Sequence, residues 1–391
     1  MTVITTKIDR QDPFVGVVDA FAAGAEKHDR LGTVAHESLH VAARAGLQTL
    51  TVPRAMGGLG AGLAETASVA RCLGAADPAA TLILAMTWIQ HAHVAMERRW
   101  PERVYREVVR DAFAGRGLLN ALRVEPELGT VMRGGIPAST ARATPEGWRL
   151  SGRKIYSTGA SVLNWYNVFA RTDSDNPQVG YFLVRAGTPG TRIEAAWDHL
   201  GMRASDSHDV VFEDALVPKD YAVDVRPASA WRQVPPLHAA WFSLTVSAIY
   251  LGIADAARDW LIGFLRSRTP TNLGRPLATL ERMQVAIGEI EALRTTAATM
   301  LASTARKADT TPAELSPEEP GLVKHLVSES AIEIVQKASA LIGNPALTRA
   351  HPLERHLRDV LCARVHSPQS DSVLKAAGIA ALGPFVESVA R

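Results

Sequence analysis

The spacing of apolar residues changes twice along the chain and divides it into three zones. From residue 12 to about residue 116, apolar residues recur at intervals of three and four, as in Phe14, Val17 and Phe21. This interval places apolar side chains on one face of a helix. The first zone is therefore predicted to be a set of amphipathic helices, separated by short breaks rich in glycine and proline.

The second zone, from residue 117 to about residue 230, contains short runs of β-branched and aromatic residues between turn signals. The run 147–160, GWRLSGRKIYSTGA, alternates the apolar Trp148 and Leu150 with polar neighbours. That alternation is typical of a strand with one buried face. We count about six or seven such runs, too closely spaced for helical crossovers, so this zone is predicted to be an antiparallel β domain.

The helical interval returns in the third zone, after Pro235-Pro236. Long helices joined by short connections imply a C-terminal four-helix bundle. The fold class is therefore α+β and mostly helical, with domains at 1–116, 117–230 and 231–391. The helical stretches expected in the third zone are 237–266, 277–308, 320–342, 352–365 and 370 to about 389.

Composition limits the classes of partner. The 42 Lys and Arg residues nearly balance the 40 Asp and Glu residues, which leaves a net charge of +2 and no field that would attract nucleic acid or an acidic membrane. The two cysteines, Cys72 and Cys362, lie in helical patterns without ligand spacing, so neither a disulfide framework nor a metal site is expected. The balanced charge argues for a small-molecule partner or another subunit, and the N-terminus lacks a signal-peptide pattern, which favours a cytoplasmic protein.

Several familiar nucleotide-binding and hydrolase motifs are absent from the sequence. There is no GxGxxG after a strand, no P-loop, no GxSxG and no HExxH. The stretch 57–65, GGLGAGLAE, has the composition of a nucleotide loop but follows no strand. It is interpreted as a turn that connects two helices.

Four stretches, taken with the order of the zones, resemble the acyl-CoA dehydrogenase superfamily of flavoproteins. They are EPELGT at 125–130, GWRLSGRKIYSTGASVLNWYNVFAR at 147–171, DHLGMRASDSHDVVFEDALVP at 198–218 and LIGNPALTRAHPLERHLRDV at 341–360. The resemblance covers nearly the whole chain. It implies two helical domains around a β domain, a bound FMN or FAD, and a homo-oligomer, usually a tetramer.

The resemblance also implies which residues contact the flavin ring. Tyr156 matches an aromatic residue and Thr158 a hydroxyl residue of the family, and Ser157 lies between them. Hydroxyl donors and an aromatic cover suit a flavin ring, because they polarise it and shield one face. Val124 and Thr130, beside and within the EPELGT stretch, are further candidate contacts.

Two candidate contacts for the flavin phosphates lie in the third zone. Arg268 matches a family arginine that reaches a pyrophosphate, since guanidinium offers a bidentate fork to phosphate. Gly343 matches one of two glycines in a turn against the dinucleotide, while Asn344 replaces the other. Both matches are partial, and a helix C-cap is an equally simple interpretation of Gly343.

The carboxylate that removes a proton in acyl-CoA dehydrogenases has no counterpart in this sequence. Counting on from Arg358-Asp359 places Ser367 where the family has its Glu, and His366 just before it. A second family location, near Phe242, is also empty, because the first carboxylate of that helix is Asp255. A hydroxyl such as that of Ser367 cannot act as the base that dehydrogenation requires.

Another branch of the same superfamily lacks this Glu and activates O2 with reduced flavin from a separate reductase. A His-x-Pro sequence replaces the Glu loop there, and VHSPQ at 365–369 is similar. His366 and Ser157 are then the candidate catalytic donors, because oxygen activation needs a donor and a pocket that excludes water. The candidate pocket residues are Trp88, Trp241, Phe242 and Ser367.

The leading hypothesis is a flavin-dependent oxidoreductase that uses reduced flavin and O2 to hydroxylate a small organic substrate. Two alternatives stay open. One is an FAD-dependent acyl-CoA or acyl-carrier dehydrogenase with a relocated base, and the other is a flavin-binding protein without turnover. The remaining histidines carry less weight; His351 and His356, in an arginine-rich segment, are expected to be solvated.

Overall fold

The computed structural model describes residues 13–127, 135–231 and 234–383. Within them the chain forms two compact units. Unit 1 contains residues up to Gly60 together with 79–198 and 203–231, and unit 2 contains 61–78, 199–202 and the described residues from 234 onward. The three predicted domain boundaries stay a prediction.

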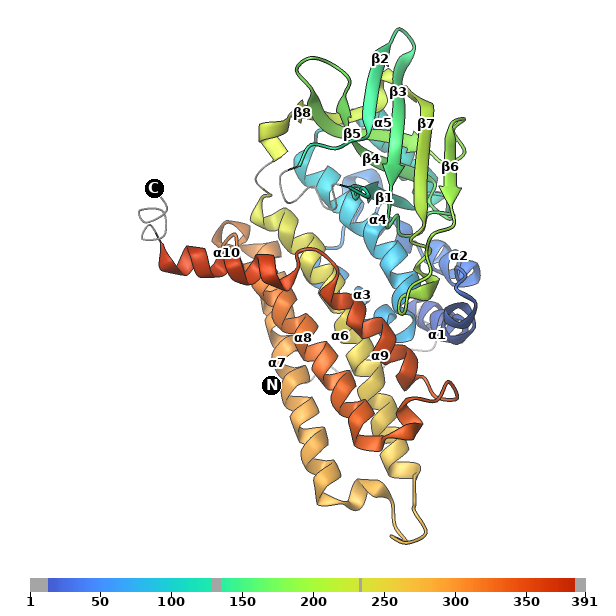
Figure 1. Ribbon diagram of the computed structural model, residues 1–391, viewed down its shortest axis with the longest axis vertical. Coiled ribbons are helices and arrows are strands. Elements are labelled where there is room, and N and C mark those ends of the chain that lie inside the picture. Colours follow the sequence, from blue (N-terminus) through green and yellow to red (C-terminus); the bar gives the residue numbers. More distant parts are fainter. Residues whose placement is uncertain (1–12, 128–134, 232–233, 384–391) are drawn as a thin grey trace. The chain divides into compact units, whose positions relative to one another are not determined.

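Unit 1 is built around one sheet, in which eight strands pair among the described residues. The order across the sheet is β6-β7-β3-β2-β4-β5-β8, with β1 paired to β4 (Figure 1). Most neighbours are antiparallel, as the sequence predicts, but β1 and β2 each pair with β4 in parallel. The strands are β1 (Leu119–Leu122), β2 (Thr140–Thr144), β3 (Gly147–Lys154), β4 (Trp165–Thr172), β5 (Gln178–Arg185), β6 (Thr191–Glu194), β7 (Asp209–Pro218) and β8 (Ala222–Pro227).

Strand β4 lies in the core of unit 1. All of its residues except Arg171 are buried, which is typical of a strand covered on both faces. Trp165 packs in one apolar cluster with Leu119 of β1 and Val108 of a helix. The helices of this unit are α1 (Pro13–Leu31), α2 (His36–Arg44), α4 (Pro78–Glu97) and α5 (Glu102–Phe113).

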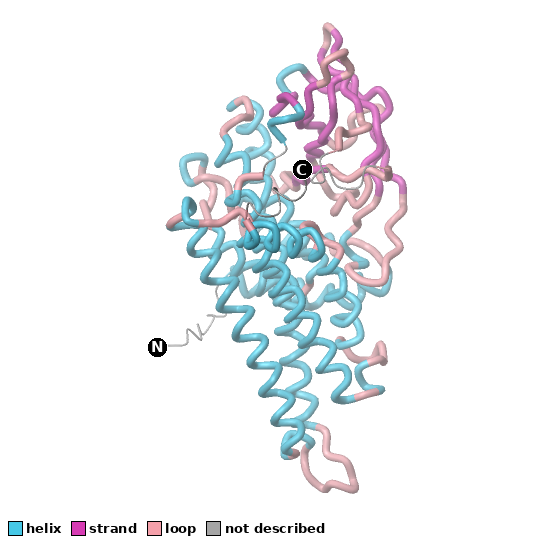
Figure 2. Tube along the Cα trace, turned by 60° about the vertical axis from the view of Figure 1, so that its left-hand side comes forward, coloured by secondary structure: helices cyan, strands magenta, loops and turns pink. Residues whose placement is uncertain are grey.

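Unit 2 is helical. Its three longest helices, α6, α7 and α8, run alongside one another, as the cyan tubes of Figure 2 show. By length and composition alone α6 is apolar enough to cross a membrane, but 78% of its most apolar window is buried, as in the central helix of a bundle. The helices are α3 (Leu63–Ala76), α6 (Pro236–Ser267), α7 (Glu281–Thr310), α8 (Glu319–Ile342), α9 (Leu353–Leu361) and α10 (Ser370–Leu382).

Two glycines allow α3 and α6 to approach closely. A Cβ atom on Gly252 of α6 would lie 2.2 Å from the carbonyl oxygen of Arg71, and one on Gly74 of α3 would lie 2.8 Å from backbone atoms of Ile249. Real carbon atoms do not approach backbone atoms so closely. The helix pair therefore requires a residue without a side chain at both positions.

The glycine-rich stretch 57–65 leads into α3, as its interpretation as a connecting turn expects. Gly62 is the N-cap of α3, and the carboxylate of Asp309 accepts hydrogen bonds from Leu63 N at 2.7 Å and Ala64 N at 2.9 Å. Two of the N–H groups that this helix start leaves without an intrahelical partner are therefore already bound by a side chain of the protein. One expectation is wrong: His356 is 3% exposed, because it faces the packed side of α9 rather than solvent.

Candidate active site

The first group of predicted site residues follows β3 in unit 1. The strand ends at Lys154, and Tyr156 then adopts a left-handed backbone conformation, with φ of 55°. Its side chain is 55% exposed, which is unusual for an aromatic residue beside a sheet. The ring meets Trp197 edge to face, with 6.3 Å between centroids. The segment thus presents an accessible aromatic face.

Backbone hydrogen bonds join this segment to residues 205–208. Ser157 N donates to the carbonyl oxygen of His208 at 3.0 Å, and Gly159 N donates to that of Ser205 at 2.9 Å. The side chain of Asp206 accepts a bond from Ser161 N at 2.6 Å. Two of the stretches that carry the family resemblance therefore form one local structure.

Three of the hydroxyl groups in this segment lie within hydrogen-bond distance of one another, and a fourth, that of Ser157, does not. Thr158 Oγ1 lies 3.1 Å from Ser207 Oγ, which in turn lies 2.8 Å from Ser205 Oγ. Ser157 is 1% exposed, and its Oγ has no hydrogen-bond partner among the described residues. A buried polar atom without a partner needs an explanation. A flavin ring with its carbonyl and nitrogen acceptors fits this donor, so the residues present suit the cofactor that the family resemblance implies.

A buried ion pair lies at the end of β3. Lys154 Nζ donates to Glu125 Oε1 and to the carbonyl oxygen of Phe169, both at 2.5 Å. Desolvation lowers the pKa of Lys154 to about 8, although Glu125 opposes the shift. Desolvation also acts to raise the pKa of Glu125, but Lys154 and the Ser139 hydroxyl outweigh it, and that pKa lies below its usual value. Glu125 is therefore an ionised structural carboxylate and not a proton acceptor for a substrate.

Val124 and Thr130 are the other predicted flavin contacts of this region, and Trp88 is a predicted pocket residue. The carbonyl oxygen of Val124 accepts a hydrogen bond from Ile155 N at 3.0 Å, which fixes the chain beside the Tyr156 segment. Thr130 lies outside the described residues. Trp88, a predicted pocket residue, is fully buried in unit 1, and its Nε1 donates to the carbonyl oxygen of Leu47 at 2.6 Å. Those contacts favour a structural role for Trp88.

The second group of predicted site residues lies in unit 2, in the loop between α9 and α10. His366 Nδ1 is 2.6 Å from the hydroxyl of Tyr250, a fully buried residue of α6. Lys324 of α8 donates from Nζ to the carbonyl oxygens of Ala363 at 2.9 Å and His366 at 2.8 Å. Burial, together with the nearby Lys324, lowers the pKa of His366 to about 4, so the imidazole is neutral near pH 7. The neighbouring Ser367 is half-buried.

Two carboxylates of unit 2, Asp255 and Asp359, are candidates to replace the missing base, and both already accept hydrogen bonds within the protein. Asp255 accepts hydrogen bonds from Arg71 Nε at 2.5 Å and Arg294 Nε at 2.6 Å. Asp359 is 2% exposed and accepts a bond from Met202 N at 2.6 Å. Neither is placed to replace the missing base at Ser367, because Asp255 is paired with two arginines and Asp359 accepts a hydrogen bond from a buried backbone N–H.

The other predicted residues of unit 2 lie at helix ends. Trp241 is 7% exposed and Phe242 is half-buried, both in the first turns of α6. Arg268 is exposed and forms the C-cap of α6, where its N–H donates to Phe264 O at 2.9 Å. Gly343 is exposed, with φ of 66°, and forms the C-cap of α8. Its conformation agrees with the C-cap interpretation.

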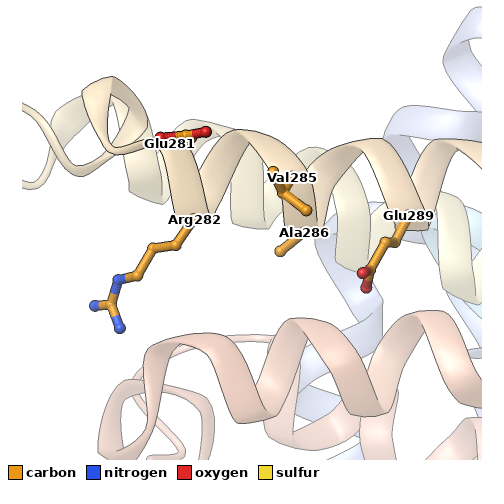
Figure 3. Close-up of a pocket in the computed structure, with 5 residues that line it drawn as sticks. All are labelled: Glu281, Arg282, Val285, Ala286 and Glu289. Carbon is orange, nitrogen blue, oxygen red and sulfur yellow. The ribbon is translucent and has the colours of Figure 1, made fainter.

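One surface hollow of unit 2 contains none of these residues. It has a volume of about 400 Å³ and lies along one side of α7. Figure 3 shows the side chains of Arg282 and Glu289 on this side, with Val285 and Ala286 between them. The hollow has no aromatic wall, and its charged lining residues, Glu281, Arg282 and Glu289, lie on one side of a single helix, so it does not compete with the loop after α9 as a candidate site.

Sequence reasoning missed Tyr250 and Lys324. Both occur inside long apolar helical stretches, where a single polar residue has many uses and no motif marks it. The only signal was their position on helices that a bundle would bring near the α9–α10 loop. Ser157 and Thr158 belong to unit 1, and His366 belongs to unit 2.

Comparison with known proteins adds independent evidence. The N-terminal domain of acyl-CoA dehydrogenase matches residues 16–118, its middle domain matches residues 125–215, and its C-terminal domain matches residues 244–370. The three matches follow one another in the order expected for the family and together span most of the chain.

Individual relatives agree with these matches. The putative acyl-CoA dehydrogenase YdbM of Bacillus subtilis is 30% identical over 92% of this chain and 92% of its own length. L-evernosamine nitrososynthase of a Micromonospora species is 31% identical over 92% of this chain and 86% of its own length. The crystal structure of KijD3 with FMN and a dTDP-linked amino sugar is 28% identical, covers 95% of this chain and 92% of its own, and has a TM-score of 0.83.

These matches confirm the predicted fold class of helical N- and C-terminal domains with a β domain between them. They also agree with the implied use of a flavin and with an enzymatic role. Family membership rests on matches along most of the chain, and the departures at Ser367 and Asn344 are differences within that family. The chain belongs to the acyl-CoA dehydrogenase superfamily of flavin-dependent oxidoreductases.

Proposed function

We propose that this protein is a flavin-dependent monooxygenase that hydroxylates a small organic substrate at carbon, nitrogen or sulfur. The substrate, O2 and a reduced flavin would give the oxygenated product, water and oxidised flavin. A separate reductase would supply the reduced flavin, and the protein would act as a homo-oligomer, with a tetramer as the expected state.

The loop after α9 is the observation that carries this proposal. Ser367 stands where dehydrogenases of the family have their base, and His366 beside it is held by Tyr250 at 2.6 Å. A neutral imidazole can donate or accept a hydrogen bond, but it does not replace a carboxylate that stays ionised at neutral pH. The second family location for a base, near Phe242, has no carboxylate, and Asp255, the first carboxylate of that helix, already accepts hydrogen bonds from Arg71 and Arg294.

The residues after β3 would hold the flavin ring. Ser157 and Thr158 offer hydroxyl groups, and Tyr156 offers an exposed aromatic face. The flavin, when bound and reduced, supplies the two electrons that O2 activation needs. Within unit 2, His366 would supply the proton-handling group that oxygen activation needs, and Trp241 and Phe242 would supply apolar surface that excludes water.

The relatives suggest which substrates to test first. L-evernosamine nitrososynthase is named for nitrogen oxidation of an amino sugar, and KijD3 was solved with a dTDP-linked amino sugar. The first substrate class is therefore a primary amine on a sugar, both free and nucleotide-linked. Aromatic amines and sulfur heterocycles form a second panel.

The proposal is tested with purified protein, FMN or FAD, NADH and a generic flavin reductase. We expect O2 consumption to form hydroxylated product in proportion to protein, with less free peroxide than the reductase alone produces. His366→Ala should lower product formation at least about tenfold, as expected for loss of one proton-handling group. His351→Ala is the matched control, since that residue precedes α9 at the end of the helix away from the loop, and it should leave the product yield unchanged.

A dehydrogenase would behave differently. Protein that retains FAD through gel filtration and is bleached anaerobically by acyl-CoA, without any need for O2, would overturn the monooxygenase proposal. YdbM makes this comparison necessary, because its name places it among the dehydrogenases. Flavin binding without either response across both substrate panels would favour a protein without turnover.

A further inference from the structure

The imidazole of His366 and the hydroxyl of Tyr250 form a pair whose protons can be assigned. The atoms Nδ1 and Oη are 2.6 Å apart, and the ring centroids are 5.6 Å apart with planes tilted by 47°. His366 lies in the loop before α10, while Tyr250 lies in the middle of α6. Both belong to unit 2.

Tyr250 must keep its proton. The side chain is fully buried, and desolvation raises its pKa well above the usual value, with smaller contributions from Cys362 and Asp359. A buried hydroxyl hydrogen requires an acceptor. Among the described residues, the one hydrogen-bond partner of this hydroxyl is Nδ1 of His366.

The direction of the hydrogen bond follows. A neutral imidazole carries one hydrogen, on either Nδ1 or Nε2. If that hydrogen were on Nδ1, the imidazole would donate to Tyr250, and the hydroxyl hydrogen would be left buried without an acceptor, at a cost of about 1–3 kcal/mol. If Tyr250 donates to Nδ1, both groups are satisfied. The hydrogen of His366 then resides on Nε2.

Lys324 fixes the main chain that carries the imidazole. This residue is 1% exposed, and its Nζ donates to the carbonyl oxygens of Ala363 and His366, at 2.9 and 2.8 Å. Side chains from α6 and α8 thus hold the ring and the backbone of the same loop residue. An ammonium group this close also disfavours a second proton on the imidazole.

We propose that Tyr250 is a positioning residue for His366: its buried hydroxyl donates to Nδ1 and fixes the tautomer that presents an N–H at Nε2. His366 is therefore a hydrogen-bond donor, and not a base, at the start of the reaction. Lys324 assists by holding the loop. The use of that donor in oxygenation rests on the proposed function, but the tautomer itself does not.

The tautomer is measured directly by NMR. Protein labelled with ¹⁵N-histidine is examined near pH 7.5 by long-range proton–nitrogen correlation, which distinguishes a protonated Nε2 from a protonated Nδ1, and His366→Gln identifies the relevant signals. We expect the Nε2–H pattern in the wild type and a mixture of both tautomers in Tyr250→Phe. A wild-type Nδ1–H pattern, or a Tyr250→Phe spectrum identical to wild type, overturns the proposal.

A matched control is available in unit 1, where the Tyr105 hydroxyl lies 3.3 Å from Nδ1 of the buried His91. Tyr105→Phe removes a comparable hydroxyl and should leave the His366 signals unchanged. If Tyr250→Phe folds poorly, Lys324→Met provides a second measurement, because a released loop should broaden or split the His366 signals. Unchanged His366 signals in Lys324→Met contradict the part of the proposal that concerns the loop.

Turnover separates this proposal from the proposed function. In Tyr250→Phe we expect product per O2 consumed to fall about five- to tenfold with little change in KM, because donor orientation and not substrate binding is lost. If the tautomer changes and turnover does not, the positioning of His366 stands and its role in oxygenation fails. If turnover falls and the tautomer is unchanged, Tyr250 does not act through Nδ1 and the positioning proposal fails.

Discussion

Asp359 on α9 accepts a 2.6 Å hydrogen bond at Oδ1 from the backbone N–H of Met202, 157 positions away in the sequence. The adjacent Arg358 donates from Nη1 to the carbonyl oxygen of Leu200 at 3.0 Å. A Cβ atom on Gly201 would lie 2.2 Å from the carbonyl oxygen of Arg358. The Arg-Asp pair before the α9–α10 loop therefore anchors residues 199–202, and its role is structural.

Replacement of Asp359 by alanine should destabilise the protein. The change leaves the N–H of Met202, a residue only 2% exposed, without the carboxylate acceptor at 2.6 Å. Loss of a hydrogen bond to a charged group costs about 1.5–3 kcal/mol. Urea unfolding followed by circular dichroism measures the effect. Asp371→Ala, at the exposed first turn of α10, is the control and should cost less than about 1 kcal/mol.

A second prediction concerns the close approach of α3 and α6. Gly252→Ala places a methyl group 2.2 Å from the carbonyl oxygen of Arg71, so the two helices must separate. We expect a loss of about 1–3 kcal/mol or more in the free energy of unfolding. Thermal unfolding should show a lower Tm.

The same helix provides the control for this change. Gly263 is exposed on α6, and a Cβ atom there meets nothing within 4 Å. Gly263→Ala should therefore stabilise the protein by about 0.5–1 kcal/mol, because alanine is the better helix former. Equal effects of the two substitutions would show that close packing at Gly252 does not limit stability.

A third prediction concerns pH. Burial lowers the pKa of His356 to about 3, with a smaller contribution from Arg355, and its Nδ1 has no partner among the described residues. Between pH 6.5 and 3 the unfolded chain binds a proton that the folded chain refuses, so stability falls as the pH falls through this range. From pH 7 to pH 5 this one residue should lower the free energy of unfolding by about 2 kcal/mol.

His356→Leu should remove that loss. The substitution keeps a similar volume and deletes a buried polar atom without a partner, so stability at pH 7 should be equal or slightly higher. Urea unfolding at pH 7, 6 and 5 gives the slope of the free energy of unfolding against pH. His40→Leu, at an exposed position of α2, should leave the slope as in the wild type. A His356→Leu slope equal to the wild-type slope would assign the acid sensitivity to other groups.

Much of the fold follows from local pattern. The switch from intervals of three and four to alternation, and back again, located the helices and strands, because burial of one face imposes those periods. The parallel pairing of β1 with β4 could not be read in the same way. A short strand such as Leu119–Leu122 has the same composition in either pairing direction, and its partner is chosen by long-range packing.

The candidate site was only partly predictable for a related reason. The family resemblance identified Tyr156, Thr158 and His366 because each lies in a stretch with a recognisable pattern. Tyr250 and Lys324 carry no local pattern, and their role depends on contacts 116 and 42 positions apart. His356 shows the opposite error, since charged neighbours in sequence suggested solvent while the helix face that bears it is buried.

The last prediction concerns Ser157. Its hydroxyl is buried and has no partner among the described residues, so the folded protein without flavin gains no hydrogen bond from it. Ser157→Ala should therefore not lower the free energy of unfolding, and should raise it by up to about 1–3 kcal/mol, because a buried hydroxyl without a partner is removed. If the hydroxyl instead bonds the flavin ring, the same substitution should weaken flavin binding about five- to tenfold, the equivalent of one hydrogen bond of about 1 kcal/mol.

Fluorescence titration of FMN into wild type and variant measures the dissociation constant. Ser139→Ala is the control, because that hydroxyl is also buried but donates to Glu125 at 2.6 Å. It should cost about 1–3 kcal/mol in stability and leave the FMN dissociation constant unchanged. A buried hydroxyl that supports flavin binding without supporting folding is one whose hydrogen-bond partner is the flavin itself. If Ser157→Ala binds FMN as tightly as wild type, Ser157 is not a flavin contact.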